Sequence, residues 1–117
     1  MNAKEEFLEH TEGRAIKCAS LWPEEKYDYD LKEYIVKFHY NLQQDYTEVE
    51  RESFLKSIDF SYYDGFGGQE LFGFIWYNDG TYSDRREYDG SEWWEHQTAP
   101  VIPDVLLGNK GEKINDN

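Results

Sequence analysis

Carboxylates are the reactive side chains that this sequence offers in greatest number, with 25 Asp and Glu residues against 12 Lys and Arg. Two of them, Asp84 and Glu95, are expected to face each other across neighbouring strands. Glycoside hydrolysis uses such a pair of carboxylates, but it also requires a cleft and a defined separation. At this composition facing pairs arise without any catalytic purpose, so the pair alone does not indicate an enzyme.

Metal and nucleophile chemistry finds little support in the other reactive residues. The histidines, His10, His39 and His96, have no i, i+4 spacing, and Cys18 is the only cysteine, so no zinc site is indicated. The acidic loops lack the twelve-residue EF-hand pattern, which leaves open only a calcium site of another kind. No serine lies in a Gly-x-Ser-x-Gly elbow. We therefore expect a protein without catalytic residues, metal or cofactor.

A glycine-rich segment, Gly65–Gly68, is the one loop that resembles a ligand cradle. Phosphate-binding loops need a following helix or a lysine, and this segment has neither. A structural turn or bulge is therefore the favoured interpretation. A small enzyme or ligand-binding domain remains an alternative, and a deep pocket lined by Tyr62, Tyr63 and a carboxylate would favour it.

The net charge of −13 limits the class of partner. It exceeds the magnitude of about 2–8 that is usual for solubility in a small domain, although solubility alone is one explanation. The other is that the field recruits a basic partner and speeds the encounter. Direct binding of nucleic acid or of an anionic membrane is disfavoured, because both require basic patches.

The cellular compartment is inferred from the lack of paired cysteines, of a signal peptide and of a membrane-spanning segment in the sequence. A lone cysteine cannot form an internal disulfide, which favours a reducing cytoplasm. No window has the charged, apolar and small-residue order of a signal peptide, and none has about 18 apolar residues in a row. We expect a cytoplasmic protein.

Two short helices are predicted. Residues 3–10 place Ala3, Phe7 and Leu8 on one helical face, and Gly13 follows as a stop. A capping box, in which Thr47 and Glu50 would bond reciprocally to backbone amides, predicts a second helix that ends near residue 57. Its core-facing residues are expected to be Val49, Phe54, Leu55 and Ile58.

Several strands are expected around these helices. Residues 14–20 are predicted to be a strand with Ile16 and Cys18 pointing inward, and residues 22–30 a surface loop. Alternation of polar and apolar residues predicts another strand over 34–40. The strongest signal is a three-stranded meander over residues 71–77, 81–88 and 91–97, because the Asp-Gly dipeptides between its strands are typical hairpin turns.

The sequence thus predicts one α+β domain over residues 1–106, with a twisted antiparallel sheet of about four or five strands and two short helices on one face. A flexible tail is expected over 107–117. On the middle strand of the meander, Arg85 and Arg86 are expected to be used internally, in ion pairs with Glu92 or over the adjacent tryptophans.

The remaining carboxylates predict an interaction surface. Residues on one face of a strand recur about every 6.8 Å, so carboxylates there could imitate a row of phosphates for a groove lined by Lys and Arg. Exposed aromatic side chains among them would serve as anchors. The predicted partner-binding residues are Asp79, Asp84, Glu87, Asp89, Glu92 and Glu95, with Asp28 and Asp30 as a second patch and Tyr82 and Tyr88 as anchors.

The stretch from Gly67 to Tyr82, followed by Glu-Tyr-Asp-Gly-Ser-Glu-Trp-Trp-Glu at 87–95, resembles small phage and prophage proteins of unassigned function. The resemblance also includes residues 13–19 and Ile102-Pro103, so it covers most of the chain. Small size and acidity are shared with phage anti-defence proteins, including anti-CRISPR and anti-restriction DNA mimics. This resemblance implies a biological context and transfers no functional residue.

We therefore predict a non-enzymatic, phage-type inhibitor of a basic, nucleic-acid-handling host protein such as a CRISPR effector or another defence nuclease, acting in the host cytoplasm. An immunity protein for a nuclease toxin is an alternative that relies on the same electrostatics. A structural phage component is another, and it would show symmetric self-association. A homodimer is compatible with each of these alternatives.

Overall fold

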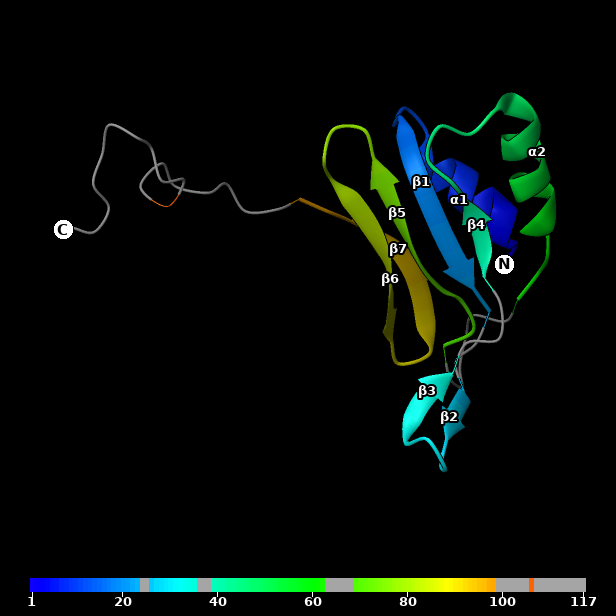
Figure 1. Ribbon diagram of the computed structural model, residues 1–117, viewed down its shortest axis with the longest axis vertical. Coiled ribbons are helices and arrows are strands. Elements are labelled where there is room, and N and C mark those ends of the chain that lie inside the picture. Colours follow the sequence, from blue (N-terminus) through cyan, green and yellow to red (C-terminus); the bar gives the residue numbers. More distant parts are fainter. Residues whose placement is uncertain (24–25, 36–38, 63–68, 99–105, 107–117) are drawn as a thin grey trace.

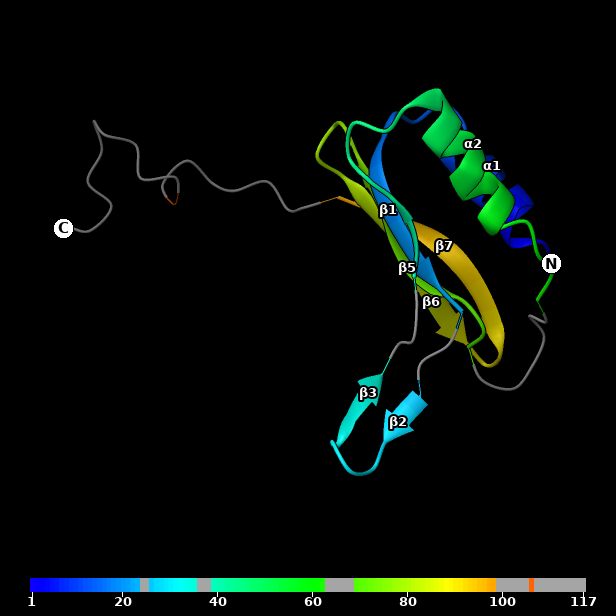
Figure 2. The same ribbon diagram turned by 45° about the vertical axis from the view of Figure 1, so that its right-hand side comes forward.

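The protein is an antiparallel sheet with both helices on one face (Figures 1 and 2). The computed structural model describes residues 1–23, 26–35, 39–62, 69–98 and 106. The elements, in chain order, are α1 (Ala3–Thr11), β1 (Ile16–Trp22), β2 (Lys26–Asp28), β3 (Glu33–Ile35), β4 (Tyr40–Leu42), α2 (Glu48–Ser57), β5 (Phe72–Tyr77), β6 (Tyr82–Tyr88) and β7 (Ser91–Gln97). Five strands form the main sheet in the order β4-β1-β5-β6-β7, so the predicted α+β class is confirmed. In the described part of the chain, neither helix has the length and apolar character to cross a membrane.

Both helices begin at a side-chain cap, and the cap of α2 is the predicted capping box. The Asn2 side chain accepts from the Glu5 amide at 2.9 Å, and Thr47 and Glu50 form both bonds of the capping box. Phe54, Leu55 and Ile58 are buried as predicted, but Val49 is 78% exposed. At about 100° per residue, Val49 lies roughly 180° around the helix axis from Ile58, which explains why that part of the prediction is wrong.

The predicted meander is confirmed as β5, β6 and β7, joined by two tight turns. In the β6–β7 turn Asp89 and Gly90 have φ values of 54° and 87°. Two successive left-handed residues are what a type I′ hairpin turn requires, and Asp-Gly is a favoured sequence for it. In the β5–β6 turn Gly80 has a φ of 89°, and Asp79 accepts from the Thr81 amide.

The structure corrects the prediction for residues 22–40. The predicted loop contains β2, which pairs with β3 in a separate two-stranded sheet that projects from the body (Figure 2). The Asp28 carboxylate organises the turn by accepting from the amides of Asp30 and Leu31. The predicted strand over 34–40 is divided, because Tyr34 belongs to β3 whereas Tyr40 begins β4 in the main sheet. Alternation with period two does not show where a chain changes its pairing partner.

The core lies between the helices and the inner face of the sheet. Phe7 of α1 packs edge-on against Phe54 of α2 and Trp94 of β7, with ring centroids 5.3 and 6.4 Å apart. Adjacent residues of β7 point to opposite faces, so Trp94 is buried and Trp93 is exposed, as an alternating strand predicts.

Cys18 was predicted to point inward, but it lies on the outer face of β1. The pairing of β1 with β5 shifts register between Ile16 and Cys18, because one extra residue forms a bulge there. Ile16 therefore packs against the core, and Cys18 pairs with the exposed Trp76.

Candidate interaction surface

The predicted carboxylates of the meander do not form one continuous row. Glu87 and Asp89 are exposed at the β6–β7 turn, beside Tyr88, which is 76% exposed. Asp79 lies in the turn at the opposite end of β6, and seven residues of strand span about 23 Å. Hydrogen bonds from the Thr81 hydroxyl and amide lower the pKa of Asp79 and keep its carboxylate ionised.

Asp84 and Glu95 face each other on the outer face, as predicted, but both carboxylates have partners. Asp84 accepts from Nε of Arg86 at 2.9 Å, and this bond raises the pKa of Arg86. Glu95 accepts from the Trp93 indole and the Gln97 amide, each at 3.1 Å. Tyr82, one of the predicted anchors, is half-buried and pairs with Gln97 in the strand register. On the strands, Asp84 is thus neutralised by Arg86 and Glu95 is hydrogen-bonded to its neighbours, so the two carboxylates do not form a row that resembles phosphates.

Glu92 is excluded from the candidate surface, because its side chain is completely buried. Its Oε1 lies 3.0 Å from Nη2 of Arg85, and its carboxylate also accepts from the amides of Glu70 and Leu71. The ion pair with Arg85 was among the predicted alternatives. The error lay in assigning the same residue to an exposed surface.

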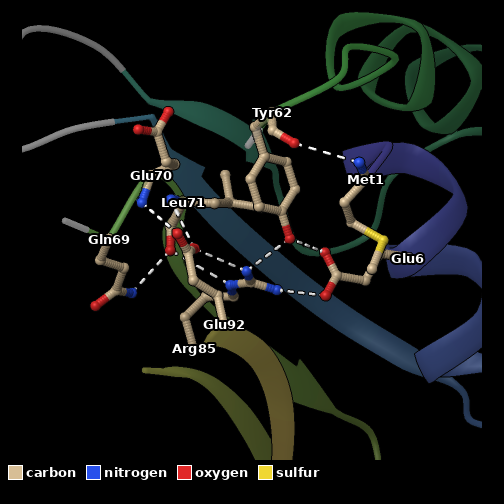
Figure 3. A network of polar contacts seen from close by, with 8 residues as sticks. All are labelled: Met1, Glu6, Tyr62, Gln69, Glu70, Leu71, Arg85 and Glu92. Carbon is tan, nitrogen blue, oxygen red and sulfur yellow. Dashed lines mark hydrogen bonds and ion pairs between the residues drawn. The ribbon is translucent and has the colours of Figure 1, made fainter. Parts of the chain in front are cut away.

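The Arg85 guanidinium links this buried carboxylate to the first helix (Figure 3). Its Nη1 lies 3.0 Å from Glu6 of α1, Nη2 donates to the Tyr62 hydroxyl at 2.8 Å, and the group stacks 5.2 Å from the Trp94 ring. Tyr62 in turn donates to Glu6. Burial alone would lower the pKa of Arg85, but the neighbouring Glu6 and Glu92 raise it, and burial raises the pKa of Tyr62. The network joins α1 to the sheet and leaves Arg85 no freedom to meet a ligand.

A separate group of carboxylates lies at one end of the molecule, where the β6–β7 turn and the β2–β3 hairpin both lie (Figures 1 and 2), and, among the described residues, eight other exposed carboxylates lie on and around the helices. We call this group the acidic end; its members are Asp28, Asp30, Glu33, Glu70, Glu87 and Asp89. Asp28 is half-buried and the other five are exposed. The sequence did not suggest that the hairpin and the turn share an end, because β2 and β3 had not been predicted as a hairpin.

A Ser–His contact occurs inside the fold but does not form a catalytic site. Nε2 of His10 lies 2.8 Å from Oγ of Ser83, which also bonds the Tyr77 hydroxyl at 2.7 Å. Ser83 is completely buried, so a substrate cannot reach it. Burial and the nearby charge of Arg14 lower the pKa of His10. Within the described residues, no three His, Cys, Asp or Glu side chains are grouped as a metal site would require.

The structure also shows a feature that sequence reasoning missed: large aromatic side chains on the outer face of the sheet. Phe74 is 38% exposed, Trp76 41% and Trp93 36%. The signal was present in β5, whose residues are apolar on both faces, a pattern typical of strands covered on both sides. The predicted glycine loop at 65–68 and Tyr63 lie outside the described residues.

Comparison with known proteins does not extend this description. No protein-family model, curated protein or solved structure matches the chain.

Proposed function

We propose that this protein is a non-enzymatic inhibitor that binds a basic, nucleic-acid-handling protein through its acidic end. CRISPR effectors and other defence nucleases are partners of this chemical class. The observation that carries the proposal is that five carboxylates from two separate hairpins, together with Glu70 just before β5, lie at one end of a chain whose net charge is −13.

The proposed mechanism is occupation of a groove lined by Lys and Arg. A protein that holds nucleic acid neutralises phosphates with these side chains, and carboxylates from two hairpins would satisfy the same cations. The net negative field would also accelerate the encounter. Tyr88 stands between Glu87 and Asp89 and offers a large exposed ring as an anchor within the charged group.

Backbone hydrogen bonds hold parts of the acidic end in place before any partner arrives. Glu87 accepts from the Gly90 amide at 2.9 Å, and Asp28 accepts from the amides of Asp30 and Leu31 at 2.8 and 2.9 Å. A carboxylate whose position is already fixed loses less conformational entropy on binding than a mobile one does.

The proposal is tested by capturing host proteins on the immobilised chain and eluting them with duplex DNA. The acidic-end variant carries Glu70→Lys, Glu87→Gln and Asp89→Asn. Asparagine is chosen because it tolerates the left-handed backbone of residue 89, where φ is 54°. We expect about a 10- to 100-fold loss of affinity for the eluted partner, mainly through a slower on-rate.

A matched control changes the net charge by the same amount on the helical side, with Glu9→Lys, Glu12→Gln and Glu52→Gln. All three residues are exposed: Glu9 lies on α1, Glu12 follows the end of α1, and Glu52 lies on α2. The control should retain nearly full affinity if the position of the charge matters more than its total. Equal binding in saturating nucleic acid, with no dependence on salt, would disprove groove occupation.

A further inference from the structure

The outer face of the main sheet is aromatic and almost neutral, unlike the chain as a whole. Side chains on this face alternate with the buried ones along each strand. The fifteen outward positions are Cys18, Ser20, Trp22, Asn41, Phe72, Phe74, Trp76, Tyr82, Asp84, Arg86, Tyr88, Ser91, Trp93, Glu95 and Gln97. Seven of them are aromatic, and the three charged ones, Asp84, Arg86 and Glu95, sum to −1; Lys17, exposed in the bulge of β1, adds one positive charge beside Cys18 and Trp76.

The rings on this face form a continuous row across β1 and β5. Trp22 lies 6.3 Å from Phe72 and 6.2 Å from Phe74, and Phe74 stacks on Trp76 at 5.6 Å between ring centroids. Beyond Trp76 the row adjoins a hollow of about 430 Å³, whose lining includes Cys18 and Gly80. A row of rings beside a hollow presents both projections and a receiving surface.

Neither helix covers this face, because both pack on the inner side of the sheet (Figure 2). Large contiguous exposed apolar patches are uncommon on monomeric proteins and mark interaction sites. The apolar run of β5 is likewise typical of a strand covered on both sides. The described residues supply only one of those two layers.

We infer that the outer face binds a second copy of this chain, so that two sheets pack face to face across a two-fold axis. The face can be self-complementary, because its row of rings and the adjoining hollow lie side by side and a two-fold axis sets the rings of each copy against the hollow of the other. Two molecules of net charge −13 repel each other, and contact through a face of net charge −1 brings the fewest like charges together. The acidic end lies at the margin of such a dimer and stays accessible.

Sedimentation equilibrium of the full chain tests this inference directly. We expect a monomer–dimer equilibrium with no larger species, accompanied by a blue shift of tryptophan emission. Raising the salt concentration from about 0.05 to about 0.5 M should strengthen the dimer, because salt screens the repulsion between the two copies. A wild-type protein that remains monomeric at concentrations up to about 1 mM would overturn the inference.

The variant Phe74→Thr/Trp76→Thr removes two exposed rings and keeps residues that suit a strand. Each change counts twice in a two-fold interface, so the dimer dissociation constant should rise at least about 100-fold. The control is Val49→Thr, which removes an exposed apolar side chain from α2 and should leave the constant unchanged. Equal dissociation constants for the two variants would place the interface elsewhere.

Alkylation of Cys18 gives a second measurement that needs no variant. Cys18 lies on the outer face beside Trp76, so dimerisation should slow its reaction with iodoacetamide as protein concentration rises. A rate independent of concentration while a dimer forms would exclude this face.

The dimer inference does not rest on the proposed function, and the dependence on salt concentration distinguishes the two. Partner binding through the acidic end should weaken with added salt, whereas self-association should strengthen. A chain that is monomeric yet captures a basic partner would overturn only the dimer. A partner lost from the Phe74→Thr/Trp76→Thr variant but kept by the acidic-end variant would show that the outer face holds that partner, and would overturn both proposals.

Discussion

Replacing Arg85 with methionine should lower the free energy of unfolding by about 3–5 kcal/mol, the usual cost of removing one partner from a buried ion pair. The Arg85 side chain is 1% exposed, Glu92 is fully buried and Glu6 is 13% exposed. The substitution leaves two carboxylates without their cation. Glu92 keeps its bonds from the amides of Glu70 and Leu71, so we expect the lower half of that range.

Urea denaturation followed by circular dichroism measures this change. With an m value near 1.5 kcal/mol/M, a loss of about 3–4 kcal/mol lowers the midpoint by about 2–3 M. The matched control is Arg86→Met on the same strand, because Arg86 also binds a carboxylate but points outward into solvent. It should leave the midpoint nearly unchanged, since exposed ion pairs add little to stability.

A double variant tests the electrostatic cause. Without the guanidinium, the buried Glu92 carboxylate is left without its cation, and Glu92→Gln removes that uncompensated charge. Arg85→Met/Glu92→Gln should recover part of the loss. Equal midpoints for Arg85→Met and Arg86→Met would refute the reasoning.

Two other predictions follow from close packing and from burial. A Cβ at Gly73 would lie 2.7 Å from the Ser20 carbonyl oxygen and 3.1 Å from the Trp94 ring, so Gly73→Ala should destabilise the fold by about 1–3 kcal/mol in thermal or urea unfolding; an unchanged midpoint would contradict this packing. The pKa of His10 is lowered in the fold, so its contribution to stability is present above about pH 6.5 and is lost as pH falls from there towards the folded pKa. His10→Gln should therefore flatten the pH dependence of the melting temperature between about pH 7.5 and 5.5, and an unaltered profile would show that another group is responsible.

Features fixed by neighbouring residues were predictable from the sequence. The meander follows from Asp-Gly dipeptides between apolar runs, and Asp89 and Gly90 adopt the left-handed conformations that these residue types favour. The helix after Thr47 follows from a capping box in which both partners lie within four residues.

Features that depend on distant pairing were not predictable in the same way. An acidic residue is usually exposed, so nothing local marks Glu92 as buried. Its burial follows from the strand pairing, which places Glu92 on the same inward face as Arg85 of the neighbouring strand. The apolar run of β5 likewise has no polar alternation to show which of its faces the helices leave open. The β2–β3 hairpin escaped prediction because its strands have three residues each.

Two pairs of adjacent residues explain why the exposed carboxylates of the meander and its exposed aromatic side chains lie on different surfaces. Arg85 and Trp94 point inward, where the cation neutralises buried Glu92 and lies over the indole. Their neighbours Arg86 and Trp93 point outward, and Arg86 neutralises Asp84 there. Alternation thus places one cation on each face of the meander, which leaves the outer face almost uncharged and the unpaired carboxylates at the turns. Because charge and apolar surface are divided in this way, added salt should act on the acidic end and on the outer face in opposite directions.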